Sequence, residues 1–250
     1  MDDDAIVPLN LTRNGEKILS YLAFSFVLDY PALAQNAGSF LHPNELRYFH
    51  KLEFPLRRTS FLLGRHAAKK ALVAYLKEPD PARIEIAFGV FTQPVVKYGS
   101  SDNPELTIAH CQDSAVAIAF PSGHPMGVDL EYIEADKRKV FENQFSDPEL
   151  NLLKHLIEAE EASYYLLWTV KEALSKAIKC GLTVPFSILE VEQIVQDGVH
   201  AYSCSFKNFA QYQGRSWIES QHVLSIALPK NTHLPADPFA VAQGTKRGLL

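Results

Sequence analysis

The sequence predicts an α+β fold for this chain of 250 residues. Two stretches, 56–76 and 146–179, repeat apolar residues at helical spacing. Short apolar runs bounded by turn residues occupy much of the remainder, and such runs typically pair as antiparallel hairpins. Because each half of the chain combines a helix with several hairpin-paired strands, the α+β class follows.

The first half contains three strands and two helices in this interpretation. The apolar run 18–29 is typical of a buried strand. Residues 42–50 and 56–76 predict helices, and 83–88 predicts a strand; the run 115–120, described below, is the third strand.

The helix predicted over 56–76 carries a basic patch in an otherwise acidic protein. Arg58, Arg65 and Lys69 share one helical face, and Gly64 interrupts the helix where a close approach would need a small residue. Three further basic residues lie nearby: Arg57, His66 and Lys70. The patch is either a landing site for anionic phosphates, which arginine binds well, or a solvated helix face.

Two carboxylates follow a predicted turn at 121–125. The flanking apolar runs, 115–120 and 126–133, predict a hairpin. Because a strand has a period of two, Asp129 and Glu131 lie on one face of its second strand. Adjacent carboxylates repel, and oxygen ligands suit Mg²⁺, so the pair indicates either a metal site or a solvated strand face.

A single long helix is predicted over 146–179, beginning at Ser146 with Pro and Glu in its first turn. Glu172 and Lys176 lie one turn apart on its polar side, either as part of a site or as an ordinary surface pair. Trp168 lies on the same side and requires cover. The opposite side carries an apolar stripe formed by Leu167, Val170, Leu174 and Ile178.

The remaining chain predicts a meander and a tail. The strands are expected over 188–194, 200–206, 216–219 and 222–228, with turns at 197–198 and 213–214. Residues 229–250 are rich in Pro, Gly and polar residues and are expected to form a loosely held or surface-strapped tail.

Composition excludes several classes of protein. The formal net charge of −5 argues against a general nucleic-acid binder. No apolar run is long enough for a membrane helix, and the acidic N-terminus lacks a signal peptide's features. The 3 cysteines have no metal-site spacing and suit a reducing compartment, so we expect a cytoplasmic protein without a membrane partner.

Two strings together are more specific than either alone. Gly-Val-Asp-Leu-Glu at 127–131, followed by Trp-Thr-Val-Lys-Glu-Ala-Leu-Ser-Lys at 168–176, resembles the signature of the 4′-phosphopantetheinyl transferases. The likeness is to the longer type, in which two similar α/β subdomains pack as a pseudo-dimer that usually works as a monomer. It implies subdomains at 1–123 and 124–228, the tail at 229–250, and an active site between the subdomains.

The resemblance implies Mg²⁺-dependent transfer, with Mn²⁺ as the alternative metal, of phosphopantetheine from coenzyme A to a serine of an acyl or peptidyl carrier protein. It assigns Asp129, Glu131 and Glu172 to the metal. Lys176 and His110 would contact phosphate oxygens, and Glu172 is the first candidate for the base that takes the serine proton, directly or through metal-bound water. A tightly bound metal ligand is a poorer base, so the two roles of Glu172 compete.

The coenzyme A contacts implied by the resemblance are less defined. Arg57, Arg58 and Arg65 are the candidates for the 3′-phosphoadenosine part. Lys171 belongs either to the phosphate site or to an ion pair. The family often places a lysine in a Gly-Lys-Pro string, whereas this chain has Thr92-Gln93-Pro94, which leaves Gln93, Lys97 or neither in that role.

An acidic carrier requires a local positive patch, and the segment 135–143, with Lys137, Arg138 and Lys139, is the candidate; a solvated helix start is the alternative.

Two rival functions remain. One is a Mg²⁺-dependent hydrolase of nucleotides or coenzyme A, although no P-loop string is present. The other is a non-catalytic carrier-binding protein.

Overall fold

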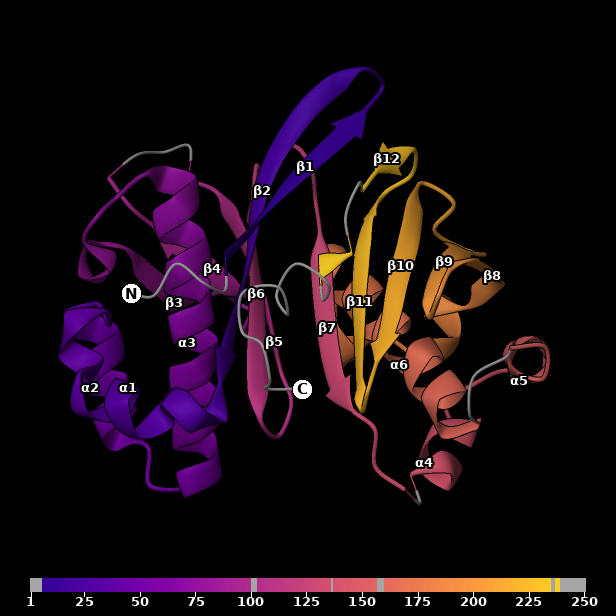
Figure 1. Ribbon diagram of the computed structural model, residues 1–250, viewed down its shortest axis with the longest axis horizontal. Helices are drawn as coiled ribbons and strands as arrows, with labels where there is room; N and C mark the ends of the chain where they lie inside the picture. Colours follow the sequence, from indigo (N-terminus) through magenta and orange to yellow (C-terminus); the bar gives the residue numbers. More distant parts are fainter. Residues whose placement is uncertain (1–5, 100–102, 136, 157–159, 235–236, 239–250) are drawn as a thin grey trace. The chain divides into compact units, whose positions relative to one another are not determined.

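The computed structural model describes residues 6–99, 103–135, 137–156, 160–234 and 237–238, and it confirms the α+β class. The chain divides into two compact units. Unit 1 comprises Met1–Pro125 with His233–Leu250, and unit 2 comprises Met126–Thr232. Each unit pairs one long helix with a five-stranded sheet (Figure 1).

The sheet of unit 1 has the order β12-β1-β2-β6-β5. Its strands are β1 (Ile6–Arg13), β2 (Glu16–Phe26), β5 (Glu105–His110), β6 (Ser114–Phe120) and the short β12 (Thr232–His233). A separate antiparallel pair is formed by β3 (Glu85–Phe88) and β4 (Pro94–Lys97). The predicted strand 18–29 is present but ends at Phe26. Strand β1 was not predicted, because Pro8 breaks a run whose buried residues only alternate.

The helices of unit 1 are α1 (Tyr30–Gln35), α2 (Pro43–Lys51) and α3 (Pro55–Leu76), which confirms the two predicted helices. Helix α3 packs on β2, β5 and β6 through small, fully buried residues such as Ala67, Ala68 and Ala71. Short 3₁₀ segments occupy Val27–Asp29, Ala37–Ser39 and Pro81–Arg83.

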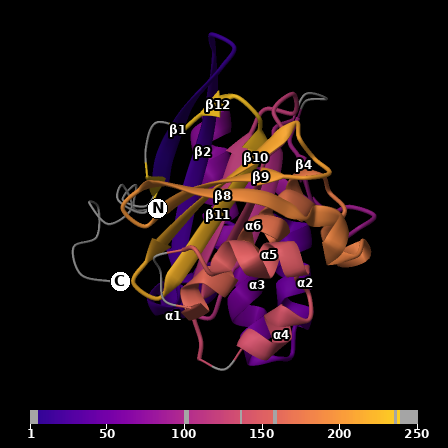
Figure 2. The ribbon, with the colours of Figure 1, turned by 90° about the vertical axis from the view of Figure 1, so that its right-hand side faces the viewer.

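The sheet of unit 2 has the order β7-β11-β10-β9-β8, and its last four strands form the predicted meander (Figure 2). The bounds are β7 (Gly127–Tyr132), β8 (Val191–Gly198), β9 (Ala201–Phe206), β10 (Tyr212–Glu219) and β11 (His222–Pro229). The helices are α4 (Arg138–Glu142), α5 (Asp147–Leu153) and α6 (Glu160–Ala177), with 3₁₀ segments at Gly181–Thr183 and Phe186–Leu189. Helix α6 packs on β7, β10 and β11.

The prediction of one helix over 146–179 was wrong. The predicted start is confirmed, because Ser146 and Glu149 form a capping box, but α5 ends at Leu153. Glu149 and Lys171, 22 residues apart, form an ion pair of 2.7 Å. On one straight helix they would be about 33 Å apart, so the chain must turn back between them.

The predicted hairpin of 115–120 with 126–133 was also wrong. Strand β6 pairs with β2 and β5, whereas β7 pairs with β11. Local alternation and turn residues identify strands but not their partners. Residues 121–125 are instead the last residues of the first stretch of unit 1.

The turn expected at 213–214 lies inside β10. A Cβ at Gly214 would be only 2.3 Å from Val170 Cγ2, so glycine permits α6 to pack against this strand. The tail expected at 229–250 begins with the end of β11 and with β12, and its residues 235–236 and 239–250 lie outside the described part. Within the described ranges, no helix combines the length and apolarity needed to cross a membrane.

Candidate active site

The carboxylates of β7 face helix α6. A Cβ at Gly127 would be 2.0 Å from the carbonyl oxygen of Ala173, so the odd-numbered positions of this strand point at the helix. Asp129 and Glu131 follow at two-residue intervals on that face. Helix α6 contributes Glu172, which interacts electrostatically with both Asp129 and Glu131, so the three carboxylates lie near one another where strand and helix touch.

Lys176 provides the positive charge at this point. Its Nζ lies 2.7 Å from Asp129 Oδ1 and donates to the carbonyl oxygen of Val128 at 3.1 Å. The side chain of Asp129 is 8% exposed, whereas that of Lys176 is 27% exposed. The ammonium therefore compensates one oxygen of Asp129 from a partly open position.

The second oxygen of Asp129 is left over. Within the described part of the chain, Oδ2 is buried and accepts no hydrogen bond. An unsatisfied buried carboxylate oxygen is costly, and a divalent cation would relieve it. The donor set of Asp129, Glu131 and Glu172 consists only of oxygen, which is the ligand type Mg²⁺ prefers. The residues present therefore fit a magnesium ion.

Crowding also changes the acidity of the two glutamates. Burial first, and then the charge of Asp129, raises the pKa of Glu131 to about 7. The same two causes, in the same order, raise the pKa of Glu172 to about 7. Lys176 acts in the opposite direction on both groups but does not cancel the rise. Lys137 also opposes the rise at Glu131, so burial and the neighbouring carboxylates outweigh both lysines there.

The structure supports the ion-pair alternative for Lys171 and not a phosphate contact. Its side chain and that of Glu149 are both fully buried, and Glu149 also accepts from the backbone N–H groups of Ser146 and Val191. The ammonium lies 5.3 Å from the ring centre of Phe145 and 5.1 Å from that of Phe186, which is within the range of a cation–π contact. No surface of this lysine remains for a ligand.

Trp168 finds its cover within unit 2. Its ring stacks on Phe186 at a centroid distance of 4.7 Å and lies 5.0 Å from the ring of Phe141. The cover that the sequence required for Trp168 is therefore supplied by aromatic side chains of the same unit.

Unit 1 contains a separate pocket of about 520 Å³ beside α3. Three of the residues assigned to coenzyme A line it, namely Arg57, Arg65 and His110. Gly64 lies in its wall, where an added Cβ would be 3.3 Å from Ile108. The lining includes three aromatic rings: Tyr48, Phe61 and Phe88.

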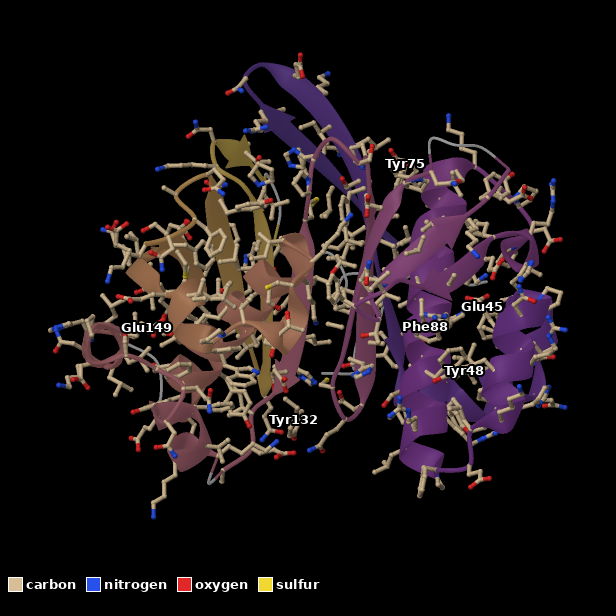
Figure 3. The ribbon with its side chains drawn as sticks, turned by 180° about the vertical axis from the view of Figure 1, so that it is seen from behind. Glu45, Tyr48, Tyr75, Phe88, Tyr132 and Glu149 are labelled. Atoms are coloured by element: carbon tan, nitrogen blue, oxygen red, sulfur yellow. The ribbon has the colours of Figure 1, made fainter. Side chains whose placement is uncertain are left out.

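Arg65 is held firmly in this wall. Its Nε lies 3.1 Å from Glu45 of α2, and its guanidinium lies 4.9 and 5.2 Å from the rings of Phe61 and Phe88. Burial lowers the pKa of Arg65, although Glu45 opposes that effect. Lys69 also pairs with Glu45, at 2.7 Å, so this part of the basic patch is internal. Figure 3 labels Glu45 and Phe88, which both contact Arg65.

Arg58 contacts the C-terminal end of α2. Its guanidinium donates to the carbonyl oxygens of Phe49 and Leu52, at 3.1 and 2.9 Å, and lies 4.3 Å from the ring of Phe49. It therefore caps the last turn of α2, and it is absent from the pocket lining. The assignment of Arg58 to the 3′-phosphate stays a prediction.

Neither candidate for the missing family lysine lines this pocket. The side chain of Gln93 accepts from the N–H of Phe91 and closes its own turn, while Lys97 is exposed and lies 3.9 Å from Glu85. Thr92 and Pro94 line the pocket instead.

Several residues with a place in these sites were not identified from the sequence. In the sequence, Tyr48, Phe61 and Phe88 are indistinguishable from ordinary apolar core residues. Only the four-residue spacing of Phe61 and Arg65 could have indicated that the guanidinium lies over the ring. The side chains of Thr169 and Ser225 form a hydrogen bond between α6 and β11. In the sequence, they are distinguished only as hydroxyl residues within apolar runs.

Comparison with known proteins agrees with the motif at the carboxylate cluster. Residues 125–227 match the family model of the 4′-phosphopantetheinyl transferase superfamily. A 4′-phosphopantetheinyl transferase (gsp) of Aneurinibacillus migulanus is 29% identical over 133 residues, which are 53% of this chain and 53% of that protein. The match thus spans about half of that relative's length.

A second relative is the L-aminoadipate-semialdehyde dehydrogenase-phosphopantetheinyl transferase of Schizosaccharomyces pombe. It is 24% identical over 198 residues, 71% of this chain and 74% of that protein. Among solved structures, a holo-(acyl-carrier-protein) synthase from Bacillus anthracis in complex with CoA (3′,5′-ADP) aligns at a TM-score of 0.37 with 21% identity. That alignment covers 46% of this chain and 96% of the synthase.

Proposed function

Because its residues 125–227 match the model of the 4′-phosphopantetheinyl transferase superfamily, we propose that this chain transfers 4′-phosphopantetheine from coenzyme A to a serine of an acyl or peptidyl carrier protein. The observation that carries the proposal is the cluster of Asp129, Glu131, Glu172 and Lys176 at the contact of β7 with α6. The relatives named as transferases support it.

The reaction needs control of charge. The serine oxygen forms a bond to the β-phosphorus of coenzyme A, the bond from that phosphorus to the bridging oxygen breaks, and 3′,5′-ADP leaves. Asp129, Glu131 and Glu172 would hold Mg²⁺, which when bound supplies positive charge against the pyrophosphate. Lys176, partly exposed beside Asp129, would hold a phosphate oxygen during the transfer.

Glu172 is the group we assign to the serine proton. A base acts best when its pKa is close to the working pH, and the pKa of Glu172 is raised to about 7. Its role as a metal ligand competes with this one, because coordination lowers the basicity of a carboxylate. Asp129 and Glu131 are the other two residues that would hold the metal.

We assign the pocket of unit 1 to the nucleotide part of coenzyme A. Its volume of about 520 Å³ lies within the range of small-molecule sites. Arg57 and His110 offer exposed cationic or polar groups for phosphate, and Arg65 offers a guanidinium supported by Glu45. The rings of Phe61 and Phe88 offer apolar surface for a planar base.

The carrier would be bound through the segment around α4. Lys139 is exposed, and Lys137 is exposed although it pairs with Glu134 at 2.5 Å; the side chain of Arg138 lies outside the described set. Val140 is 60% exposed and adds an apolar contact.

All 3 cysteines are free thiols, which supports the proposal of a cytoplasmic enzyme.

The test is the intact mass of an apo carrier domain after incubation with the protein, coenzyme A and Mg²⁺. We expect a gain of one phosphopantetheine group, lost with a chelator and lost in Asp129→Ala. Glu192→Ala, which removes an exposed carboxylate of the same unit, should retain the gain. Consumption of coenzyme A with unchanged carriers would favour a hydrolase, and unchanged coenzyme A across a panel of carriers would contradict the proposal.

A further inference from the structure

Three hydroxyl groups form a chain inside unit 2, beneath the carboxylate cluster. Thr169 of α6, Ser225 of β11 and Ser216 of β10 are each fully buried. Ser216 Oγ lies 2.7 Å from Ser225 Oγ, and Ser225 Oγ lies 2.7 Å from Thr169 Oγ1. These two hydrogen bonds are side-chain links between the core helix and two strands of the sheet.

The direction of the chain follows from counting protons. A hydroxyl has one proton to donate, and Thr169 donates its own to the carbonyl oxygen of Leu166 at 3.1 Å. Thr169 must therefore accept from Ser225, and Ser225 must in turn accept from Ser216. The order Ser216 to Ser225 to Thr169 to Leu166 uses each of the three hydroxyl protons once, so this arrangement satisfies both buried links.

This chain of hydroxyl groups connects the two elements that carry the carboxylate cluster. Ser225 is the register partner of Asp129 across β7 and β11, so both side chains emerge on the face that α6 covers. Thr169 precedes Glu172 by three residues and lies on nearly the same side of α6. The bridge between Thr169 and Ser225 therefore connects the neighbour of Asp129 to the helix turn that carries Glu172.

A steric contact alone does not fix this geometry. The backbone approach of Gly127 to Ala173 sets how closely α6 lies on β7, but a smooth contact leaves the helix able to slide or roll. A hydrogen bond of 2.7 Å limits both motions because it requires one distance and one direction.

We propose that Thr169 and Ser225 are positioning residues that hold Glu172 at the distance from Asp129 which Mg²⁺ requires. The inference rests on the proposed function, because it takes the metal site from there. Mg²⁺ demands near-ideal octahedral geometry at short distances, whereas Ca²⁺ accepts longer and more variable ones. Loss of the bridge should therefore weaken the binding of Mg²⁺ while sparing that of Ca²⁺.

The experiment measures MgCl₂ and CaCl₂ binding by isothermal titration calorimetry, on the full chain with and without coenzyme A. Thr169→Val removes the hydroxyl and keeps the shape, and we expect about a tenfold loss of Mg²⁺ affinity with little change for Ca²⁺. Thr169→Ser keeps a hydroxyl and should restore the wild-type affinity. Ser225→Ala breaks the same bridge from the other side and should reproduce the loss.

Ser175→Ala is the matched control. Ser175 is also buried on α6, but its hydroxyl donates to the carbonyl oxygen of Glu172 within its own helix, at 2.8 Å. Its removal should leave the preference for Mg²⁺ over Ca²⁺ unchanged. Circular dichroism at the titration temperature verifies that each variant is folded.

The outcomes separate the two proposals. A wild-type protein that binds no Mg²⁺, with or without coenzyme A, overturns the proposed function and this inference with it. If Thr169→Val and Ser225→Ala are folded and bind Mg²⁺ as tightly as the wild type does, the inference alone is overturned. An equal loss of both metals in Thr169→Val, or an equal loss of Mg²⁺ in Ser175→Ala, also overturns it, because general loosening of the helix would then be the cause.

Discussion

At the scale of single residues, the partner decides the role. Lys171 and Lys176 stand five positions apart on α6, yet the first is buried against Glu149 and the second is partly open beside Asp129. The same holds for Arg58, which caps α2, and Arg65, which lines the pocket. The sequence supplied the residue types of both sites, but it could not show which cations are already occupied by the fold.

The raised pKa of Glu172 predicts how the stability of the metal-free protein depends on pH. An unfolded glutamate titrates near pH 4.3, so between that pH and about 7 the folded state binds more protons than the unfolded state. The contribution of Glu172 to the free energy of unfolding therefore falls as pH rises through this window. Removing the titrating group should remove that fall.

We expect metal-free Glu172→Gln to gain about 1–3 kcal/mol over wild type between about pH 5 and about pH 8, as measured by urea unfolding. Adding Mg²⁺ should reduce or reverse the advantage at the higher pH, because only wild type keeps the full ligand set. A difference between the two proteins that stays constant with pH would contradict this account.

At the scale of elements, close backbone contacts decide where helices lie. Helix α6 approaches β7 at Gly127 and β10 at Gly214, and neither position has room for a Cβ. Gln213 and Gly214 suggested a turn, so the sequence predicted only the part of β10 over 216–219, whereas the strand begins at Tyr212. Helix α3 and the meander were predictable because their periodicity is local, whereas the partner of β7 lies far along the sequence.

Gly127→Ala should destabilise unit 2 strongly. The new Cβ would be 2.0 Å from the carbonyl oxygen of Ala173 and 2.6 Å from the N of Ala177, and both are backbone atoms that move only with the helix. We expect a loss of about 2 kcal/mol or more in the free energy of unfolding. Urea denaturation measures it.

Gly123→Ala is the matched control, because a Cβ there would meet nothing within 4 Å. It should change stability by no more than about 0.5 kcal/mol. Equal effects of the two substitutions would show that the contact with α6 is not what requires glycine at position 127.

At the scale of the whole molecule, the two groups of candidate residues lie in different units. The carboxylate cluster lies entirely in Met126–Thr232, and the pocket with Arg57, Arg65 and His110 lies entirely in unit 1. The distance between the motifs along the sequence made this placement predictable, whereas the roles of the residues stay predictions. The α+β class was predictable for the same reason, since it depends on composition and local period and not on which strands pair.

The position of Trp168 against Phe186 has a spectroscopic consequence. The chain has 2 tryptophans, Trp168 and Trp217, and both belong to unit 2. Their emission therefore reports unit 2 alone, whereas far-ultraviolet circular dichroism reports both units. In urea, we expect Mg²⁺ to move the fluorescence midpoint of wild type upward, by ligand-linked stabilisation, and not that of Asp129→Ala. If Mg²⁺ does not change the fluorescence midpoint of the wild type, the metal does not bind at the carboxylate cluster. The native indole groups would thus serve as a label-free sensor for occupancy of that cluster.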